Sequence, residues 1–199
     1  MYIPEEFIES DKERIISIAN QYAFGVLVSI NEGMPFANHL PLMLEENEAF
    51  KIYGHMAKSN DQWTHFHDGK DVLVIYQGPH AYISPSNYEG RGVPTWNYSA
   101  VHMYGKASVV SENERIAKIV EALSYKYEKN KESPWQPSYH TEALDAIVGF
   151  EILVDRIEAK SKLSQNRPEE DRRKIISDMR KAGGEGEAGV AQLMEENEL

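Results

Sequence analysis

The 199-residue sequence has no cysteine, and it also lacks a long apolar segment. The absence of cysteine excludes disulfides, thiolate metal sites and cysteine nucleophiles. A helix that spans a bilayer needs roughly 20 apolar residues in a row, and no run approaches that length. The N-terminal segment MYIPEEFIESD is acidic and lacks the apolar core of a secretory signal. We therefore expect a cytoplasmic protein without a membrane partner.

Positive charge is also scarce. The chain has 21 Lys and Arg against 32 Asp and Glu, which gives a formal net charge of -11. A broad surface for nucleic acid is therefore unexpected, and any DNA contact would need a local basic patch, doubled in a dimer, or would be indirect. The most basic segment, residues 167–181, alternates Arg and Lys with Glu and Asp. This pattern is typical of a solvated helix with ion pairs one turn apart.

Short apolar and β-branched runs dominate the first 160 residues. They predict about six or seven strands, near residues 22–31, 35–44, 50–54, 71–76, 80–84, 95–110 and 149–159. Helices are predicted after residue 11, after Ser59 or Asn60, after residue 111, after Thr141 and after Pro168. The pattern indicates a mainly β or α+β fold built on a small barrel. We expect a barrel domain over residues 1–166 and a C-terminal helical appendage over residues 167–199.

The predicted strand from Thr95 to Tyr104 carries an unusual set of side chains. Period-2 alternation places Trp96, Tyr98, His102 and Tyr104 on one face, and Thr95, Asn97 and Ser99 on the other. Both faces can form hydrogen bonds, and one offers flat aromatic surface, which suits a planar ligand with polar edges. The alternative is a half-buried barrel strand whose aromatic residues pack the wall. On that interpretation, replacing Trp96 with Ala would reduce stability.

Two polar clusters follow predicted strands, and each precedes a predicted helix. The first is Lys58, Ser59 and Asn60, and the second is Lys162, Ser164, Gln165, Asn166 and Arg167. A cation, hydroxyl and amide near a helix start are the donors that bind phosphate. The alternative is that both clusters are helix caps and surface charges. Their presence together with an aromatic strand favours a phosphate-bearing planar ligand.

Other kinds of site find little support. The sequence has neither a P-loop nor a G-x-G-x-x-G after a strand, so no Rossmann cofactor site is predicted. It has no G-x-S-x-G and no diagnostic pair of carboxylates, so no catalytic residue is assigned. His65 and His67 form an H-x-H pair, but no third ligand has a diagnostic spacing, and no metal site is predicted.

Seven segments, taken in order, carry a family resemblance: YIPEEF, HLPL, GHMAKSN, GPHAYISPSNY, VPTWNY, IVGFEI and KLSQNRPEEDR. Together they resemble the PaiB family of FMN-binding negative transcriptional regulators over about residues 1–181. One departure is Asn87, where the family pattern leads us to expect Trp.

The resemblance implies a split β-barrel that forms a homodimer, with FMN at the subunit interface. It also implies repression of genes for degradative enzymes and sporulation. By the same resemblance, Lys58, Ser59 and Asn60 would lie at the phosphate, and Thr95, Trp96, Asn97 and Tyr98 along the flavin. Lys162, Ser164, Gln165 and Asn166 would come from the same or the partner subunit.

Two alternative functions fit the same fold. One is a flavin-dependent oxidoreductase that acts on a nicotinamide or a small molecule. The other is a haem-binding or haem-degrading protein, in which His39, His55 or His102 would ligate iron.

Overall fold

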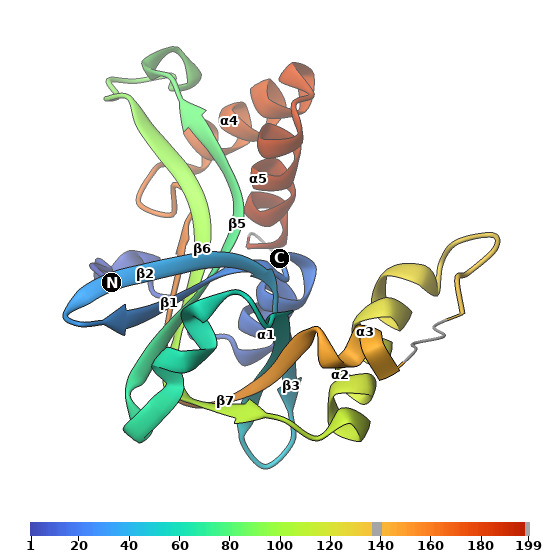
Figure 1. Ribbon diagram of the computed structural model, residues 1–199. Coiled ribbons are helices and arrows are strands. Elements are labelled where there is room, and N and C mark those ends of the chain that lie inside the picture. The colour runs from blue at the N-terminus through green and yellow to red at the C-terminus, as the bar shows by residue number, and fades with distance from the viewer. Residues whose placement is uncertain (137–140, 198–199) are drawn as a thin grey trace. The chain divides into compact units, whose positions relative to one another are not determined.

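The computed structural model describes residues 1–136 and 141–197 (Figure 1). The chain divides into two compact units. Unit 1 comprises residues 1–21, 77–101 and 158–199, and unit 2 comprises residues 22–76 and 102–157. Each unit is described below by itself.

Most of the regular structure in the described residues is a seven-stranded sheet, ordered β2-β1-β5-β6-β7-β4-β3. The strands are β1 (Phe24–Asn31), β2 (Met34–Pro41), β3 (Met43–Glu46), β4 (Phe50–Ala57), β5 (Asp71–Ile83), β6 (Thr95–Val110) and β7 (Ile147–Lys162). The pairs β1–β2, β1–β5, β3–β4 and β4–β7 are antiparallel. The mainly β prediction is confirmed. In the described residues the sheet ends at β2 and β3 rather than closing into a ring.

Strand boundaries differ from the prediction in two places. The separate strands expected at 71–76 and 80–84 are one strand, β5, which continues through Gly78 and Pro79. A Cβ at position 78 would collide with the Ser99 hydroxyl, so glycine lets this part of the chain lie close to Ser99. The single strand expected at 35–44 is divided at Leu42, whose backbone N–H donates to the Ala23 carbonyl oxygen at 2.8 Å.

In unit 2 the core lies between alternating apolar side chains of neighbouring strands. Leu27 of β1 pairs with Val74 of β5, and Ile52 of β4 pairs with Ile152 of β7, and all four are fully buried. Helix α2 (Asn113–Glu128) packs its buried Ile116, Ile119 and Val120 against Val110 and Leu144. The remaining helical elements of this unit are η2 (Asp61–Gly69) and α3 (Thr141–Asp145).

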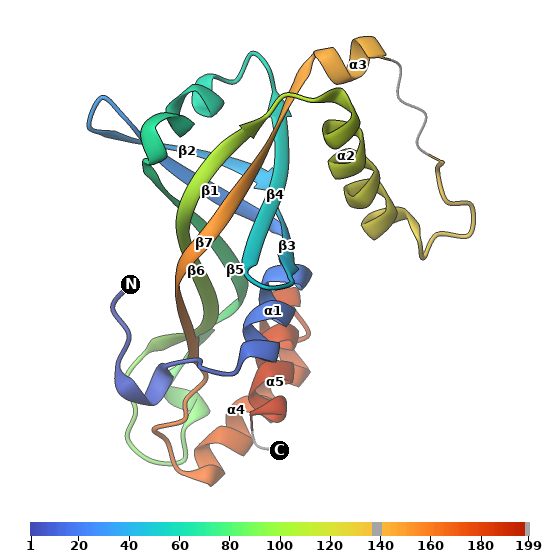
Figure 2. The same ribbon diagram turned by 90° about the horizontal axis from the view of Figure 1, so that it is seen from below.

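In unit 1 the C-terminal helices share an apolar core with the end of β5. Helices α4 (Glu169–Ala182) and α5 (Glu185–Glu196) lie side by side (Figure 2). The core they share with β5 is made of Ala81, Ile83, Tyr88, Leu163, Ile175, Met179, Val190, Ala191 and Met194. The domain boundary at residues 166 and 167 stays a prediction. The unit also contains η1 (Glu5–Phe7), α1 (Lys12–Gln21) and η3 (Pro85–Asn87).

One face of α4 holds the segment that connects β5 to β6. The Asp171 carboxylate accepts a hydrogen bond from the Glu89 backbone N–H at 2.8 Å, and the Lys174 ammonium donates to the Ser86 carbonyl oxygen at 2.6 Å. The Asp178 carboxylate accepts from the Asn87 side-chain amide at 3.0 Å. Positions 171, 174 and 178 are three and four residues apart, so they share one side of the helix.

Within the described ranges, no helix is both long and apolar enough to cross a membrane.

Candidate functional site

Strand β6 turns its aromatic residues outward. Asn97 and Ser99 are fully buried, whereas Trp96 is 53% exposed and Tyr98 is half-buried. The face that carries Thr95, Asn97 and Ser99 in the sequence pattern is therefore the packed one. The expectation that Trp96 forms part of the barrel wall is wrong, because more than half of its surface is open to solvent. Side-chain alternation alone could not decide this, since both faces carry polar groups.

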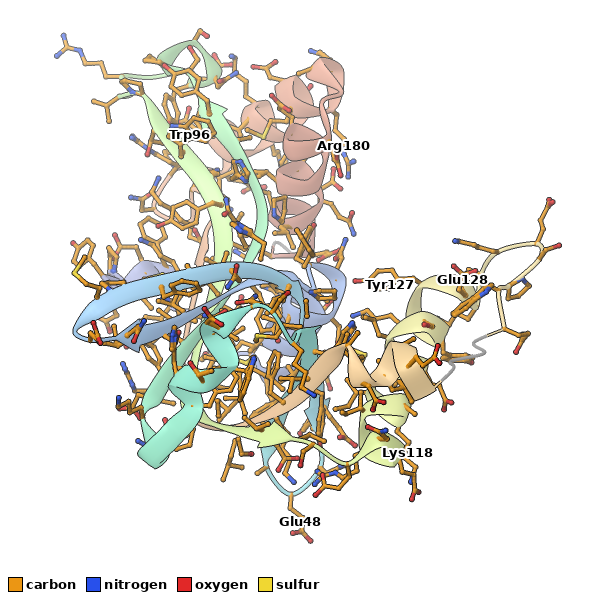
Figure 3. The ribbon with its side chains drawn as sticks, in the orientation of Figure 1. Glu48, Trp96, Lys118, Tyr127, Glu128 and Arg180 are labelled. Atoms are coloured by element: carbon orange, nitrogen blue, oxygen red, sulfur yellow. The ribbon has the colours of Figure 1, made fainter. Side chains whose placement is uncertain are left out.

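The exposed Trp96 is part of an aromatic patch in unit 1, together with His80 and Tyr82 of β5. The His80 and Tyr82 ring centroids each lie 6.0 Å from that of Trp96, and the Tyr82 ring meets it edge to face. Tyr82 is 50% exposed, and Figure 3 shows Trp96 on the strand β6, next to β5. The patch is a ready surface for a flat ring, since aromatic pairs gain energy beyond the area they bury.

Lys162 of β7 lies beside this patch. Its ammonium donates to the Thr95 hydroxyl at 2.6 Å and to the Trp96 carbonyl oxygen at 2.7 Å. Burial lowers the pKa of Lys162, and the positive charges of Lys160 and Arg167 lower it further. Lys162 therefore lies close enough to Lys160 and to Arg167 to be repelled by each. This is a local positive region within an acidic chain, and it favours an anion.

The predicted residues Asn97 and Ser164 contact each other. Asn97 Nδ2 donates a hydrogen bond to the Ser164 hydroxyl oxygen at 2.9 Å, and the Ser164 hydroxyl lies 3.2 Å from Asn97 Oδ1, to which it can donate. Both are buried, and Ser164 has a left-handed backbone with φ of 64°. Gln165 closes the same turn, because its Oε1 accepts from the Leu163 N–H at 2.7 Å. This group shapes the turn that follows β7 and leaves Asn166 exposed.

Lys58, Ser59 and Asn60 form a turn in unit 2 between β4 and η2. The Lys58 N–H donates to the Ala146 carbonyl oxygen at 2.9 Å, and its carbonyl accepts from the Trp63 indole at 3.0 Å. The Lys58 ammonium is exposed, and its contact with the Asp145 carbonyl oxygen is a long 3.4 Å. Among the side chains that the structure describes, which exclude those of residues 67, 68 and 141, this ammonium has no salt bridge. The predicted polar cluster is thus a turn with an available cation.

Sequence reasoning missed a buried polar network next to this turn. The Gln62 side chain is fully buried. Its Oε1 accepts from Asn38 Nδ2 at 2.9 Å, and its Nε2 donates to the Leu27 carbonyl oxygen at 2.9 Å and to the Ser29 hydroxyl at 3.1 Å. Ser29 also contacts His65 Nδ1 at 2.9 Å. No local motif signals this network, because Asn38 and Gln62 are separated by 24 positions.

A second missed feature is a pocket of about 400 Å³ between α2 and the β3–β4 hairpin of unit 2. Tyr53 lines this pocket. Burial, then the hydrogen bond to the Glu45 carboxylate, raises the pKa of Tyr53 to about 12. The Arg115 guanidinium in the wall donates to Glu151 at 2.8 Å, and Lys118 donates to Glu114 at 2.8 Å. The charged groups that line this pocket are thus already paired within the protein.

The three histidines considered for haem all lie in unit 2. His39 is exposed on β2, with its ring 6.2 Å from that of Phe24. His55 is half-buried on β4, and burial lowers its pKa. His102 is half-buried on β6, with its ring 6.5 Å from that of Tyr104. Among the residues the structure describes, no three His, Cys, Asp or Glu side chains gather as a metal site.

Each unit, taken by itself, contains residues that fit one chemical part of FMN. A phosphate needs cationic and amide donors, which the Lys58–Asn60 turn presents. An isoalloxazine ring needs flat apolar surface with donors at its edge, which the Trp96 patch and Lys162 present. When bound, FMN would supply a planar ring able to accept and donate electrons.

Residues 1–156 match the family model described as "Putative FMN-binding domain". The chain belongs to this FMN-binding family. It is 42% identical over 202 residues to "Protease synthase and sporulation protein PAI 2" of Bacillus subtilis, a match that covers 98% of this chain and 97% of that protein. An uncharacterized protein of Emericella nidulans is 30% identical, over 80% of this chain and 81% of its own length. The PaiB family resemblance is thereby confirmed, and FMN as the cofactor agrees with the description of the family.

Solved structures share the fold at low sequence identity. The FAD and haem binding protein of Mycobacterium smegmatis has a TM-score of 0.63 at 13% identity, covering 88% of this chain and 80% of that one. The flavocytochrome Anf3 of Azotobacter vinelandii has a TM-score of 0.63 at 15% identity, covering 83% and 74%. The flavin-protein split-barrel fold expected from the sequence is confirmed.

Proposed function

We propose that this chain is an FMN-binding regulatory protein that represses genes for degradative enzymes and sporulation. Membership of the FMN-binding family supports the first part of this proposal. The name of the Bacillus subtilis relative, which refers to protease synthesis and sporulation, supports the second.

The observation that carries the FMN proposal is the exposed Lys58 ammonium. The chain has 32 acidic residues, yet in the described part of the molecule Lys58 contacts only neutral carbonyl oxygen. A lysine left without a carboxylate in so acidic a protein is available to a ligand anion. Lys58, Ser59 and Asn60 are the proposed contacts of the FMN phosphate, as a cation, a hydroxyl and an amide on one turn.

The Trp96 patch is proposed, on separate evidence, as a surface for the flavin ring. Thr95, Trp96, Asn97 and Tyr98 supply this part of β6. Trp96 and Tyr98 offer their rings, while the buried Asn97 holds Ser164 and positions the turn after β7. Lys162 and the exposed Asn166 offer donors, and Gln165 holds their turn in shape.

A homodimer is proposed through the β1–β2 hairpin of unit 2, with a second copy of this chain as the occupant. In the described residues β2 is the outermost strand of the sheet, so one of its edges has no neighbouring strand. The hairpin also exposes four large apolar side chains, Phe24 at 66%, Ile30 at 44%, Met34 at 70% and Phe36 at 38%. So many exposed apolar residues on one edge hairpin favour burial against another protein surface.

The test begins with the absorption spectrum of the purified protein, followed by titration with FMN and with riboflavin, which lacks the phosphate. We expect flavin bands and tighter binding of FMN than of riboflavin. A Soret band would instead support the haem alternative, and bleaching of bound flavin by a nicotinamide with turnover would support the oxidoreductase. A protein that takes up neither flavin nor haem would contradict the proposal.

The variant Lys58→Ala localises the phosphate. Hydrogen bonds to charged groups contribute about 1.5–3 kcal/mol, so FMN affinity should fall roughly 10- to 100-fold, while riboflavin affinity is unchanged. Lys51→Ala is the matched control, because Lys51 is an exposed lysine on β4, the strand that ends just before the Lys58–Asn60 turn. Unchanged FMN affinity in Lys58→Ala would place the phosphate elsewhere.

A further inference from the structure

The buried network beside the Lys58–Asn60 turn has a defined direction of hydrogen bonding. The Leu27 carbonyl oxygen can only accept, so the Gln62 nitrogen must face it, and Gln62 Oε1 must face the Asn38 amide. Ser29 accepts from Gln62 Nε2 at 3.1 Å and lies 2.9 Å from His65 Nδ1. Its own hydroxyl hydrogen is therefore free to donate to that nitrogen. Each amide and hydroxyl in this chain of contacts has a set orientation.

The network reaches the turn through one atom, Asn60 Oδ1. That oxygen accepts from the Gln62 backbone N–H at 3.1 Å and from Asn38 Nδ2 at 3.2 Å. At the other end of the turn, Lys58 is held through its backbone by Ala146 and Trp63. A three-residue turn is thus fixed at both ends, while the Lys58 ammonium and the Ser59 side chain between them stay exposed.

The same network ties the turn to the edge of the sheet. Asn38 belongs to β2 and pairs in register with Leu27 of β1. Gln62 Nε2 also lies 3.3 Å from the Phe36 carbonyl oxygen of β2, and the Phe36 and His65 rings meet edge to face at 5.2 Å. A shift of β2 would therefore change the partners of Gln62 and, through Asn38, those of Asn60.

We propose that Asn38 and Gln62 are positioning residues that hold the Lys58–Asn60 turn in its phosphate-binding conformation and couple that turn to the edge strand β2. The proposal rests on the phosphate location proposed above. The physical reason is preorganisation: a turn that is already ordered binds without the entropy cost of ordering its side chains. Because β2 also carries the proposed dimer surface, a change at that surface would alter affinity for the phosphate.

Asn38→Ala tests the coupling in the full-length protein. It removes both the donor to Asn60 and the donor to Gln62, but no proposed contact of FMN. We expect FMN affinity to fall about three- to tenfold, the effect of releasing one or two ordered side chains. Riboflavin affinity should not change. Asn47→Ala is the chemically matched control, since Asn47 contacts Glu45 at an exposed turn of the same unit, and it should leave both affinities unchanged.

Loss of the Asn38 donor also leaves a buried Gln62 oxygen short of a partner, so the fold of each variant is checked by urea unfolding before titration. If Asn38→Ala does not fold, Asn38→Ser is titrated in its place, because a serine hydroxyl can still donate one hydrogen bond. A smaller loss of FMN affinity in Asn38→Ser, again without a riboflavin effect, supports the proposal.

Two results would overturn the coupling. One is an unchanged ratio of FMN to riboflavin affinity in a folded Asn38 variant. The other is an equal loss for both flavins, which would indicate a general structural role. Lys58→Ala separates this inference from the proposed function: if Lys58→Ala weakens FMN and the Asn38 variants do not, only the positioning role fails. If Lys58→Ala has no effect, the phosphate location fails first.

Discussion

Gly105 lies where β6 and β7 approach each other closely in unit 2. Replacing it with alanine therefore tests whether the free energy of unfolding rises or falls. In the interior of a strand, exchanging glycine for alanine ordinarily stabilises by about 0.5–1 kcal/mol, because the unfolded chain loses freedom. At position 105, an added Cβ would lie closer than 3.0 Å to the Leu153 carbonyl oxygen and 3.0 Å from the Val154 Cα. Both atoms belong to backbone, so neither can rotate away.

The expected result is therefore destabilisation. Overpacking in a filled interior costs about 1–3 kcal/mol, and contacts with rigid backbone place this site in the upper part of that range, at about 2–3 kcal/mol. The entropic gain of up to about 1 kcal/mol leaves about 1–2 kcal/mol. In a chain of this size that corresponds to a Tm lower by roughly 2–8 °C. Urea unfolding and a thermal melt measure both quantities.

Gly90→Ala provides the control, because nothing lies within 4 Å of a Cβ at that position. It should stabilise by about 0.4–1 kcal/mol through the same unfolded-state effect. If Gly105→Ala is as stable as the parent protein, or changes stability like Gly90→Ala, the close approach of β6 and β7 is refuted.

The remaining predictions concern a capping residue, two titratable groups and DNA binding. Asn87→Ala should destabilise by about 1–2 kcal/mol, because it removes the acceptor of the Ser84 N–H and the donor to Asp178; urea unfolding measures this. The hydrogen bond from Asn87, then Lys174, lowers the pKa of Asp178 below 3.8. The stabilisation that Asp178 contributes is therefore present above pH 4 and should be lost as pH falls below that value. Urea unfolding curves recorded at a series of acidic pH values measure this loss. Burial, then the hydrogen bond to Glu45, raises the pKa of Tyr53 from 10.0 to about 12, so Tyr53→Phe should remove one late step from an absorbance titration. Because the pKa is higher in the folded protein, the contribution of Tyr53 to stability should be lost as pH rises from 10 to 12. Finally, Arg173 pairs with Glu169 and Lys181 lies 3.9 Å from Asp178, so Arg173→Ala should leave anisotropy with promoter DNA unchanged at low salt; a tenfold loss would indicate direct contact by α4.

Local patterns in the sequence account for much of the fold. Alternation of apolar and polar residues located the strands, since burial of one face requires a period of two. The same pattern could not choose the outward face of β6, because Trp96 and Tyr98 are as suited to a core as Asn97 and Ser99 are to a surface. The structure buries Asn97 because Ser164 satisfies its amide, and that partner lies 67 positions away in the chain.

The candidate site divides in the same way. Lys58, Ser59 and Asn60 stand together in the sequence, so a turn with phosphate donors could be predicted from neighbours alone. Asn38 and Gln62 could not be linked to that turn, because their role depends on the pairing of β1 with β2. Asn87 is an instructive departure from the family pattern: it caps η3 through the Ser84 N–H and bonds to Asp178. Asn87 therefore forms two hydrogen bonds that a Trp side chain at this position could not form together.

The contacts along α4 have a consequence for how far the chain can be truncated and still bind flavin. The family match ends at residue 156, and a fragment cut there would lose Asp171, Lys174 and Asp178. The segment before Trp96 would then lose the hydrogen bonds that α4 makes to the Glu89 N–H, the Ser86 carbonyl and the Asn87 amide. The same cut would remove the end of β7 with Lys162, and Ser164 after it. We therefore expect such a fragment to take up flavin poorly, and a fragment that keeps both C-terminal helices to bind it.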